Sequence, residues 1–297
     1  MGEKDIVEKT LEAYNDVFAD IVNVLLFKGE RIIQPDDLED QTPRAMYKAD
    51  DKIREVERDV AKRWVKNNIR IACIGLENQT KADPYISLRV MGYDGVEYRT
   101  QLRDLKEVEK PCPVVTLVLY FGYKGHWNAP LSILQALEVP EILKPYVTDV
   151  KVNLFEIAYL TWEQVNMFQS DFREVARYFV QMQEDGEYRP SDDEISHIES
   201  ILQLLNVMDK DHRFELSVNE RENAKEARTM SEWLTKVINE NQAIGLKKGI
   251  EQGIEKGKFT AYADMVRKNR ISAKEASEEL GMTETEFCKE AGITVKQ

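Results

Sequence analysis

The sequence predicts an α/β protein in which a mixed sheet is flanked by helices and followed by a helical C-terminal extension. Two apolar runs of strand length, residues 69–79 and 113–122, contain few polar residues before their ends. A continuous apolar run is typical of a strand buried on both faces. Helical patterns lie before, between and after these runs, so we expect the central strands to be joined through helices that cover the sheet.

Composition limits the class of protein. The chain has 297 residues, of which 42% are hydrophobic and 32% are charged, as in a soluble globular protein. No run of about 18 apolar residues is present and residues 1–9 are charged, so we expect neither a membrane span nor an export signal, and a cytoplasmic location. The three cysteines form no CxxC pair and lie far from the three histidines, so neither a disulfide framework nor a zinc site is indicated.

Residues 5–27 place apolar side chains at helical spacing and predict an amphipathic helix. Asp20 falls on roughly the opposite side from this apolar stripe, but Val17, Val24 and Phe27 flank it there. We therefore expect Asp20 to be partly buried. The alternative is a surface aspartate on the polar side of the helix.

Residues 28–49 are predicted to form a loop, and a half-exposed strand is predicted to start at about Arg58. The turn after this strand decides what lies opposite Glu77. A three-residue turn or a bulge places Asp59 directly across the antiparallel pair from Glu77, whereas a two-residue turn places Leu76 opposite Asp59. Two-residue type I′ turns favour glycine at their second position and none is present, so we expect the longer turn or a bulge.

The strand at residues 69–79 ends in Glu77, Asn78 and Gln79. Side chains alternate along a strand, so Glu77 and Gln79 point to one face and can share a ligand. An ionised glutamate at the end of a buried strand costs roughly several kcal/mol unless a partner compensates its charge. Magnesium is one candidate for this partner, and a nearby arginine is the other.

The remaining elements alternate between helices and strands. A helix is predicted over residues 84–104, although Gly92 and Gly95 weaken it, and strands are predicted over residues 113–122 and 151–160. Further helices are predicted over residues 164–184, 192–208 and 220–240. The change of character near residue 185 divides the chain into a domain at 1–184, an acidic helical region at 185–241 and a tail at 242–297.

The tail repeats glycine at positions 245, 249, 253 and 257. Each glycine costs a helix about 1 kcal/mol, and close approach of a second helix is the compensation that glycine allows. We therefore expect self-association into a dimer, with a flexible tether as the alternative. Ser272 and Thr283 are candidate N-caps, and Gly281 closes the first of two short helices that resemble a helix-turn-helix.

Charge is distributed unevenly. The net charge of −13 argues against a nucleic-acid partner, because phosphate binding needs a positive surface. However, residues 51–110 hold 13 Lys+Arg against 11 Asp+Glu, whereas residues 181–226 hold 5 against 13. The acidic residues are concentrated away from the strand that ends in Glu77.

Together, Asp20, Asp59, Glu77 and Gln79 resemble the PD-(D/E)XK nuclease superfamily and, within it, the Rpn family of recombination-promoting nucleases and putative transposases. The segments that carry the resemblance, over about residues 5–180, are 18–23, 58–60, 75–79, 119–122 and 152–157. It implies a restriction-endonuclease-like fold in which Asp59 and Glu77 bind Mg²⁺, which Mn²⁺ can replace, and Asp20 is an auxiliary acid. It also implies DNA as the partner.

This chain departs from the superfamily at one position, where Gln79 stands in place of a lysine. Glutamine can orient a water but cannot lend it positive charge, so either the metal supplies activation or Lys62, Arg63 or Lys81 moves in. These three cations and Arg89 are the expected substrate-binding residues.

The leading functional hypothesis is a Mg²⁺-dependent DNA endonuclease linked to recombination or a mobile element. The alternative is a catalytically lapsed, oligomeric module that binds nucleic acid or protein. A third interpretation is a structural domain in which Glu77 is a core carboxylate paired with Arg63 or Arg89.

Overall fold

The computed structural model describes residues 11–41, 44–49, 52–57, 59–67, 69–104, 110–209, 214 and 227–293. The chain divides into two compact units, Met1–Leu234 and Thr235–Gln297. The predicted divisions after residues 184 and 241 stay predictions. No helix of the described residues is long and apolar enough to cross a membrane.

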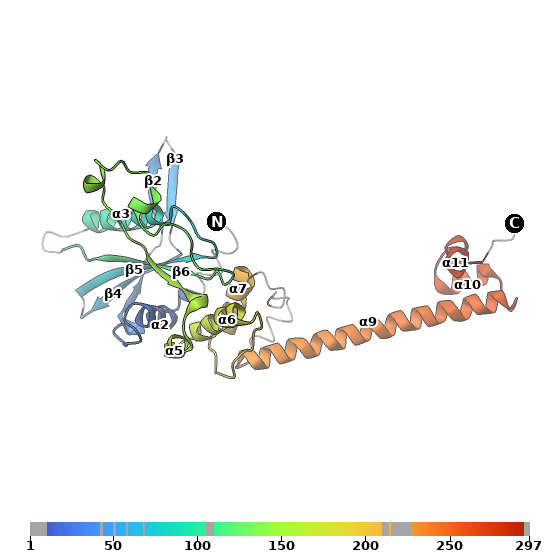
Figure 1. Cartoon of the computed structure of the whole chain (residues 1–297). Coiled ribbons are helices and arrows are strands. Elements are labelled where there is room, and N and C mark those ends of the chain that lie inside the picture. The colour runs from blue at the N-terminus through green and yellow to red at the C-terminus, as the bar shows by residue number, and fades with distance from the viewer. Residues whose placement is uncertain are drawn as a thin grey trace. The chain divides into compact units, whose positions relative to one another are not determined.

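A five-stranded mixed sheet forms the centre of the first unit, in the order β1-β4-β5-β6-β7 (Figure 1). The three strands β5, β6 and β7 are parallel, whereas β4 pairs antiparallel with both β1 and β5. The bounds are β1 Leu38–Asp40, β4 Val60–Lys66, β5 Ile69–Gln79, β6 Val114–Tyr120 and β7 Asn153–Glu156. A separate two-stranded sheet pairs β2 (Arg44–Ala49) with β3 (Lys52–Glu57).

Helices cover both faces of the central sheet (Figure 1). The helix α3 (Ile86–Asp104) lies on one face, where Ile86 and Val90 pack on Val118 of β6. The opposite face is covered by α2 (Asn15–Leu25) and α6 (Phe172–Glu184), with α5 (Trp162–Met167) beside them. This layered α/β architecture is the predicted fold class.

The hairpin of β4 and β5 contains a bulge. Lys66 pairs with Ile69, so only two residues lie between the strands, and Asn67 adopts a φ of 51°, which asparagine tolerates. The register then shifts by one residue, because Val65 pairs with Arg70 but Trp64 pairs with Ala72. The bulge at position 71 therefore supplies the one-residue offset that places Asp59 opposite Glu77. The turn itself stays two residues long although it contains no glycine.

Several predicted elements differ from the structure. Residues 28–49, predicted to be a loop, contain β1, β2 and a short 3₁₀ helix at Pro35–Asp37. The strand predicted over 151–160 ends at Glu156, where a 3₁₀ turn follows at Ile157–Tyr159. The helix predicted over 164–184 is two helices, α5 and α6, because the chain breaks at residues 168–171 to make tertiary contacts. The helix predicted over 192–208 begins only at Ile198, as α7 (Ile198–Asp209).

Other elements were predicted correctly. The helix expected over 84–104 forms as α3 in spite of its two glycines, and the strand expected over 113–122 forms as β6. Residues 220–226 of the helix predicted over 220–240, and residues 5–10 of the helix predicted over 5–27, lie outside the described part. The short helix α4 (Ile133–Ala136) has a Ser132 N-cap, and a further 3₁₀ turn lies at Lys144–Tyr146.

The second unit consists of helices. Most of α9 (Met230–Arg267), which is continuous through the glycine repeat, belongs to it, with α10 (Ala273–Leu280) and α11 (Glu284–Ala291). Capping boxes at Ser272 and Thr283 and a left-handed Gly281 confirm the predicted helix ends. Its small core contains Ala263, Ala276, Phe287, Cys288 and Ala291.

Candidate functional site

The bulged register brings two carboxylates together at the end of β5. Val60 pairs with Leu76, so Asp59, one residue before β4, lies opposite Glu77. The backbone N–H of Asn78 donates to Oδ2 of Asp59 at 2.6 Å, which fixes this carboxylate beside the strand end. Asn78 points to the other face, where its side chain donates to Glu12 at 2.8 Å. The alternation expected for Glu77 and Asn78 is confirmed.

Glu77 is a buried carboxylate with an unusual charge balance. Its side chain is 2% exposed, and burial followed by the charge of Asp59 raises its pKa to about 8. Arg89, Tyr93 and Gln79 act in the opposite direction. Its Oε1 accepts from the guanidinium of Arg89 and from the amide of Gln79 at 3.1 Å. Its other oxygen, Oε2, is buried and has no hydrogen-bond partner among the described residues.

Arg89 comes from the sheet-facing side of α3. Its guanidinium contacts Glu77, donates to Asp83 at 3.0 Å and donates to the Tyr93 hydroxyl at 3.2 Å. Of the two arginines expected as partners of Glu77, the structure therefore selects Arg89. Burial opposes the charge of Arg89, but Glu77 and Tyr93 raise its pKa. Burial and the charge of Glu77 also raise the pKa of Tyr93 to about 12, so its hydroxyl keeps its proton.

The donor set fits a hard divalent cation that keeps several waters. Mg²⁺ binds in proteins through one or two carboxylates plus waters and substrate phosphates. Asp59 and Glu77 supply two carboxylates, and the unpartnered Oε2 of Glu77 is a buried lone-pair donor. Within the described ranges no group of three or more His, Cys, Asp or Glu side chains is arranged to hold a metal. An ion here would thus depend on this acid pair and on waters.

The other predicted cations do not all reach this site. Lys62 lies on the opposite face of the sheet, where it is 1% exposed, contacts Asp40 and lies over the Phe18 ring. The expectation that Lys62 supports Gln79 or binds substrate therefore disagrees with its position. Arg63 is on the same face as Glu77 but opposite Cys73, four residues back along β5. Lys81 is exposed and lies two residues beyond Gln79.

Asp20 is placed in a different environment from the one expected. One of its oxygens accepts from Arg31, and the other accepts from the backbone N–H groups of Gln169 (2.8 Å) and Ser170 (2.7 Å). These N–H groups lie at the break between α5 and α6, where a helix start leaves donors unsatisfied. Asp20 is therefore buried, as expected, but its contacts fix the start of α6, and none of those described joins it to the acid pair. Its role as an auxiliary acid stays a prediction.

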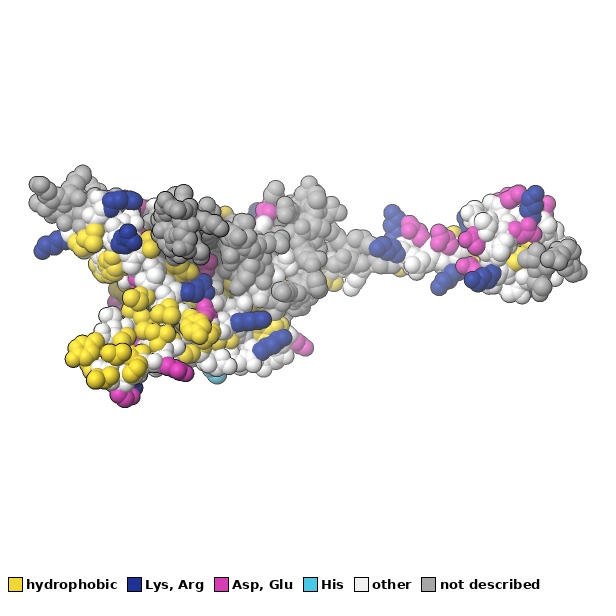
Figure 2. Space-filling model, turned by 90° about the horizontal axis from the view of Figure 1, so that it is seen from above, with side chains coloured by type: hydrophobic (Ala, Val, Ile, Leu, Met, Phe, Trp, Pro, Cys, Tyr) yellow, Lys and Arg dark blue, Asp and Glu magenta, His cyan; other side chains and the backbone are white. Residues whose placement is uncertain are grey.

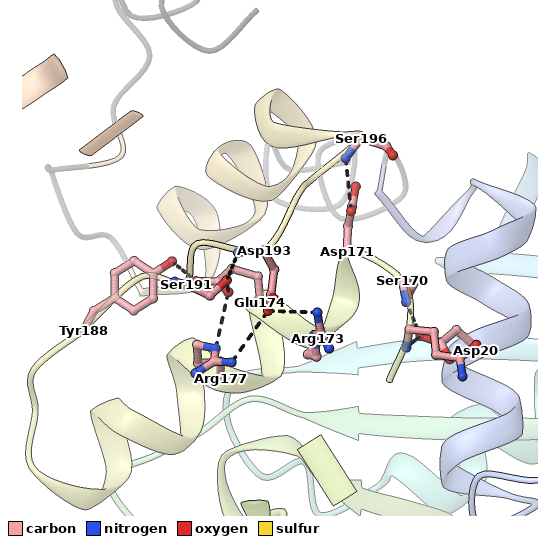
Figure 3. A network of polar contacts seen from close by, with 11 residues as sticks. Asp20, Ser170, Asp171, Arg173, Glu174, Arg177, Tyr188, Ser191, Asp193 and Ser196 are labelled. Atoms are coloured by element: carbon pink, nitrogen blue, oxygen red, sulfur yellow. Dashed lines mark hydrogen bonds and ion pairs between the residues drawn. The ribbon is translucent and has the colours of Figure 1, made fainter. Parts of the chain in front are cut away.

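The polar network that begins at Asp20 continues along α6 (Figure 3). Asp171 accepts from the backbone N–H groups of Ser196 and His197, and buried Glu174 accepts from Ser191 and Tyr188. Asp171, the N-cap of α6, and Glu174 within the helix thus anchor the segment that leads to α7. This network stabilises the fold around α6. Its residues on α6 and before α7 lie far from Glu77 in the sequence.

Two further polar groups were not predicted from the sequence. Tyr93 was seen only as part of a helix, although Arg89, Tyr93, Glu97 and Gln101 recur at four-residue spacing, a polar stripe that indicates contact with buried polar partners. The second group is His126 with Glu156. The register aligns Gln79 with Tyr120 and Tyr120 with Glu156, at the carboxyl ends of three neighbouring strands.

Glu156 holds the loop after β6. It accepts from the backbone N–H of Trp127 at 2.6 Å and lies 3.2 Å from Nδ1 of His126, whose ring stacks on Tyr159 at 3.7 Å. His126 nevertheless remains 69% exposed. Polar side chains thus extend along the carboxyl edge of the sheet from the acid pair.

Apolar side chains are exposed on the α3 side of the sheet. Figure 2, which looks onto this side, shows hydrophobic side chains gathered there. The exposed large residues include Tyr85 just before α3, Met91 and Leu102 of α3, and Ile142 and Tyr146 of the segment after β6. Nothing in the described structure covers them.

The chain is thus an α/β protein that has a mixed sheet, helices on both faces of this sheet and an acid pair at a strand end. The family described as "Putative transposase, YhgA-like" matches residues 63–212, just over half of the chain, so the chain belongs to this family, which is of the Rpn/PD-(D/E)XK type. The matched residues include Glu77, Gln79 and Arg89 but begin after Asp20 and Asp59. Comparisons with curated proteins and with solved structures gave no significant match.

Replacing Asp20 by alanine should destabilise the first unit by about 3 kcal/mol, because it leaves Arg31 without its carboxylate and two backbone donors unsatisfied. Chemical denaturation of the full chain measures this loss. Asp16→Ala, on the exposed side of the same helix, is the matched control and should change stability by less than about 0.5 kcal/mol. Equal stability of both variants would show that the Asp20 contacts are not structural.

The raised pKa of Glu77 predicts a pH-dependent stability in the absence of metal. In the folded state burial and Asp59 disfavour the ionised form of Glu77, and Arg89 compensates it only in part, so the pKa is about 8 there and 4.5 in the unfolded chain. The contribution of the Glu77 proton to the free energy of unfolding is therefore fully present below pH 4.5. It is lost as the pH rises from 4.5 through about 8. In EDTA, Glu77→Gln should gain stability relative to the wild type over this interval. A constant difference between the two across the interval would contradict the raised pKa.

Proposed function

We propose that the chain is a metal-dependent endonuclease that hydrolyses phosphodiester bonds of DNA in recombination or the movement of a mobile element. Membership of a family described as putative transposases supports DNA as the substrate and a nuclease-like activity. The observation that carries the proposal is the acid pair. Asp59 faces Glu77 across β4 and β5, and one buried oxygen of Glu77 lacks a hydrogen-bond partner among the described residues.

Asp59 and Glu77 are the residues that would hold Mg²⁺, with Mn²⁺ as a substitute. When bound, the ion supplies an activated water and neutralises charge on the scissile phosphate. The chain's own contribution is to position the ligands before substrate arrives. The backbone N–H of Asn78 holds Asp59, while Arg89 and Tyr93 hold Glu77 from the side of α3.

Gln79 acts as a neutral group that orients water. Its amide N–H donates to Glu77, which leaves its amide oxygen as an acceptor for a water proton. A neutral amide adds no positive charge, so cations at the same edge must attract the phosphate backbone. Arg89 touches Glu77 directly, and Lys81 and Lys124 are exposed in the segments that follow β5 and β6. A DNA strand at this edge would therefore meet local positive charge, although the net charge of the protein is −13.

A second candidate function is a catalytically lapsed module that binds nucleic acid or protein. One contact favours it: Arg89 already compensates the charge of Glu77, as it would in a purely structural ion pair. Gln79 in place of lysine points the same way. Metal-dependent cleavage separates the two candidates, because only the nuclease requires it.

Asp59→Ala and Glu77→Ala should each abolish metal-dependent nicking of supercoiled plasmid. The fold should survive, because removing one of two neighbouring carboxylates relieves repulsion in the metal-free state. The assay compares Mg²⁺, Mn²⁺ and EDTA, with Asp16→Ala as a control that retains wild-type activity. Wild-type nicking rates in both acid variants would remove this pair from the chemistry, and absence of nicking in the wild type would favour the lapsed module.

We also propose that the chain forms a dimer through α9, which would pair two sites for cleavage of both strands. Leu246, Ile250 and Ile254 are exposed at four-residue spacing. A Cβ added at Gly249, Gly253 or Gly257 would meet no atom within 4 Å, so the chain's own described residues do not use the close approach that these glycines permit. The isoleucines and glycines fall on one side of the helix, which is suited to α9 of a second copy.

Replacing both Ile250 and Ile254 by glutamine should convert the dimer into a monomer, because it places polar groups in the proposed helix contact. Both side chains are exposed, so the fold of one chain should not change. Light scattering gives the protomer number of the full chain and the variant. The Lys258→Gln variant is the exposed control on the same helix. A dimer that persists in the double variant would place the interface elsewhere.

A further inference from the structure

The guanidinium of Arg89 contacts the same carboxylate that the proposed function assigns to a metal ion. It donates to Oε1 of Glu77, while Asp59 lies across the strand pair and Oε2 remains without a described partner. A divalent cation on this acid pair would place two like-signed groups against one carboxylate. Arg89 and the metal therefore compete for Glu77, and binding of one weakens binding of the other.

Arg89 is able to leave Glu77 without leaving the site. Its side chain is 42% exposed, whereas that of Glu77 is 2% exposed, so the arginine is the partner that can move toward solvent. Its Nη1 donates to Asp83, which is itself partly exposed and lies just before α3. This contact does not depend on Glu77 and can hold the arginine near the strand end while the rest of its N–H donors turn outward.

An outward-turned guanidinium matches a phosphate. Its planar fork binds two phosphate oxygens at once, which an ammonium group cannot do. Of the site's cations described above, Arg89 is the one that touches a member of the acid pair, so a phosphate next to a metal on that pair would lie within reach of the same side chain.

We propose that Arg89 is an exchangeable counter-ion: it compensates Glu77 in the metal-free protein and moves to a DNA phosphate when a divalent metal takes Glu77. The inference rests on the proposed function and deepens it, because it assigns to one residue the coupling between metal and DNA. Metal binding frees Arg89 for the phosphate, and phosphate binding frees Glu77 for the metal. Each ligand therefore raises the affinity for the other by the same factor.

The test is a calorimetric titration of the full chain with Mn²⁺ alone, in the wild type and in Arg89→Gln. Removing the competing cation should raise Mn²⁺ affinity about tenfold, which corresponds to about 1.4 kcal/mol. Arg99→Gln is the matched control, since Arg99 is an exposed arginine of the same helix, and it should bind Mn²⁺ like the wild type. Thermal melting checks that each variant is folded.

Arg89→Lys is the second variant and keeps the test decisive if Arg89→Gln does not fold. Lysine retains a positive charge but cannot contact Glu77, Asp83 and Tyr93 together, so its Mn²⁺ affinity should lie between those of the wild type and Arg89→Gln. A second readout is fluorescence anisotropy of a labelled DNA duplex with Ca²⁺ or EDTA. Ca²⁺ should tighten DNA binding by the wild type by a larger factor than in Arg89→Gln.

The outcomes separate this inference from the proposed function. Mn²⁺ binding by the wild type with no gain in Arg89→Gln would overturn the exchange and leave the nuclease proposal in place. Mn²⁺ binding by Arg89→Gln alone would support the exchange and show that Arg89 excludes metal from the DNA-free protein. Absence of binding in the wild type and in the variants would overturn both.

Discussion

The one-residue bulge in the β4–β5 hairpin is the constraint on which the site depends. The strands leave their short turn in a register that would place Leu76 opposite Asp59, and the shift between Trp64 and Val65 moves Glu77 into that position. Because side chains alternate along a strand, a one-residue shift reverses which face each residue meets. The bulge thus puts Asp59 and Glu77 together and leaves Asn78 to face α2.

Bringing two carboxylates together at a buried strand end is unfavourable without a cation, and α3 supplies one. Burial and Asp59 raise the pKa of Glu77 to about 8, while Arg89 lowers it. In a metal-free protein Arg89 supplies the compensation that an ion would supply in the proposed nuclease. The same contact is consistent with a structural ion pair, which is why binding of a metal, and not the ion pair itself, decides between the interpretations.

Local pattern predicted much of this architecture, and tertiary contacts decided the rest. Alternation along the strand placed Glu77 and Gln79 on one face, and the same rule applied to β4 separates Lys62 from Asp59, three residues away. The polar stripe of α3 was also readable, at Arg89, Tyr93, Glu97 and Gln101. By contrast, the position of the bulge and the contacts of Asp20 with backbone groups about 150 residues away leave no local signal. The family resemblance suggested Asp20 as an auxiliary acid, whereas the contacts that the structure shows for it hold the start of α6.

The central claim is that Asp59 and Glu77 share a divalent cation that displaces Arg89. Anomalous diffraction from crystals of the full chain grown with Mn²⁺ tests it most directly, because the signal locates the ion and the density shows the arginine. The account predicts a Mn²⁺ peak between the two carboxylates, with the Arg89 guanidinium turned away from Glu77 and still near Asp83. Saturating Mn²⁺ with no peak at this pair, and with Arg89 still on Glu77, would contradict it.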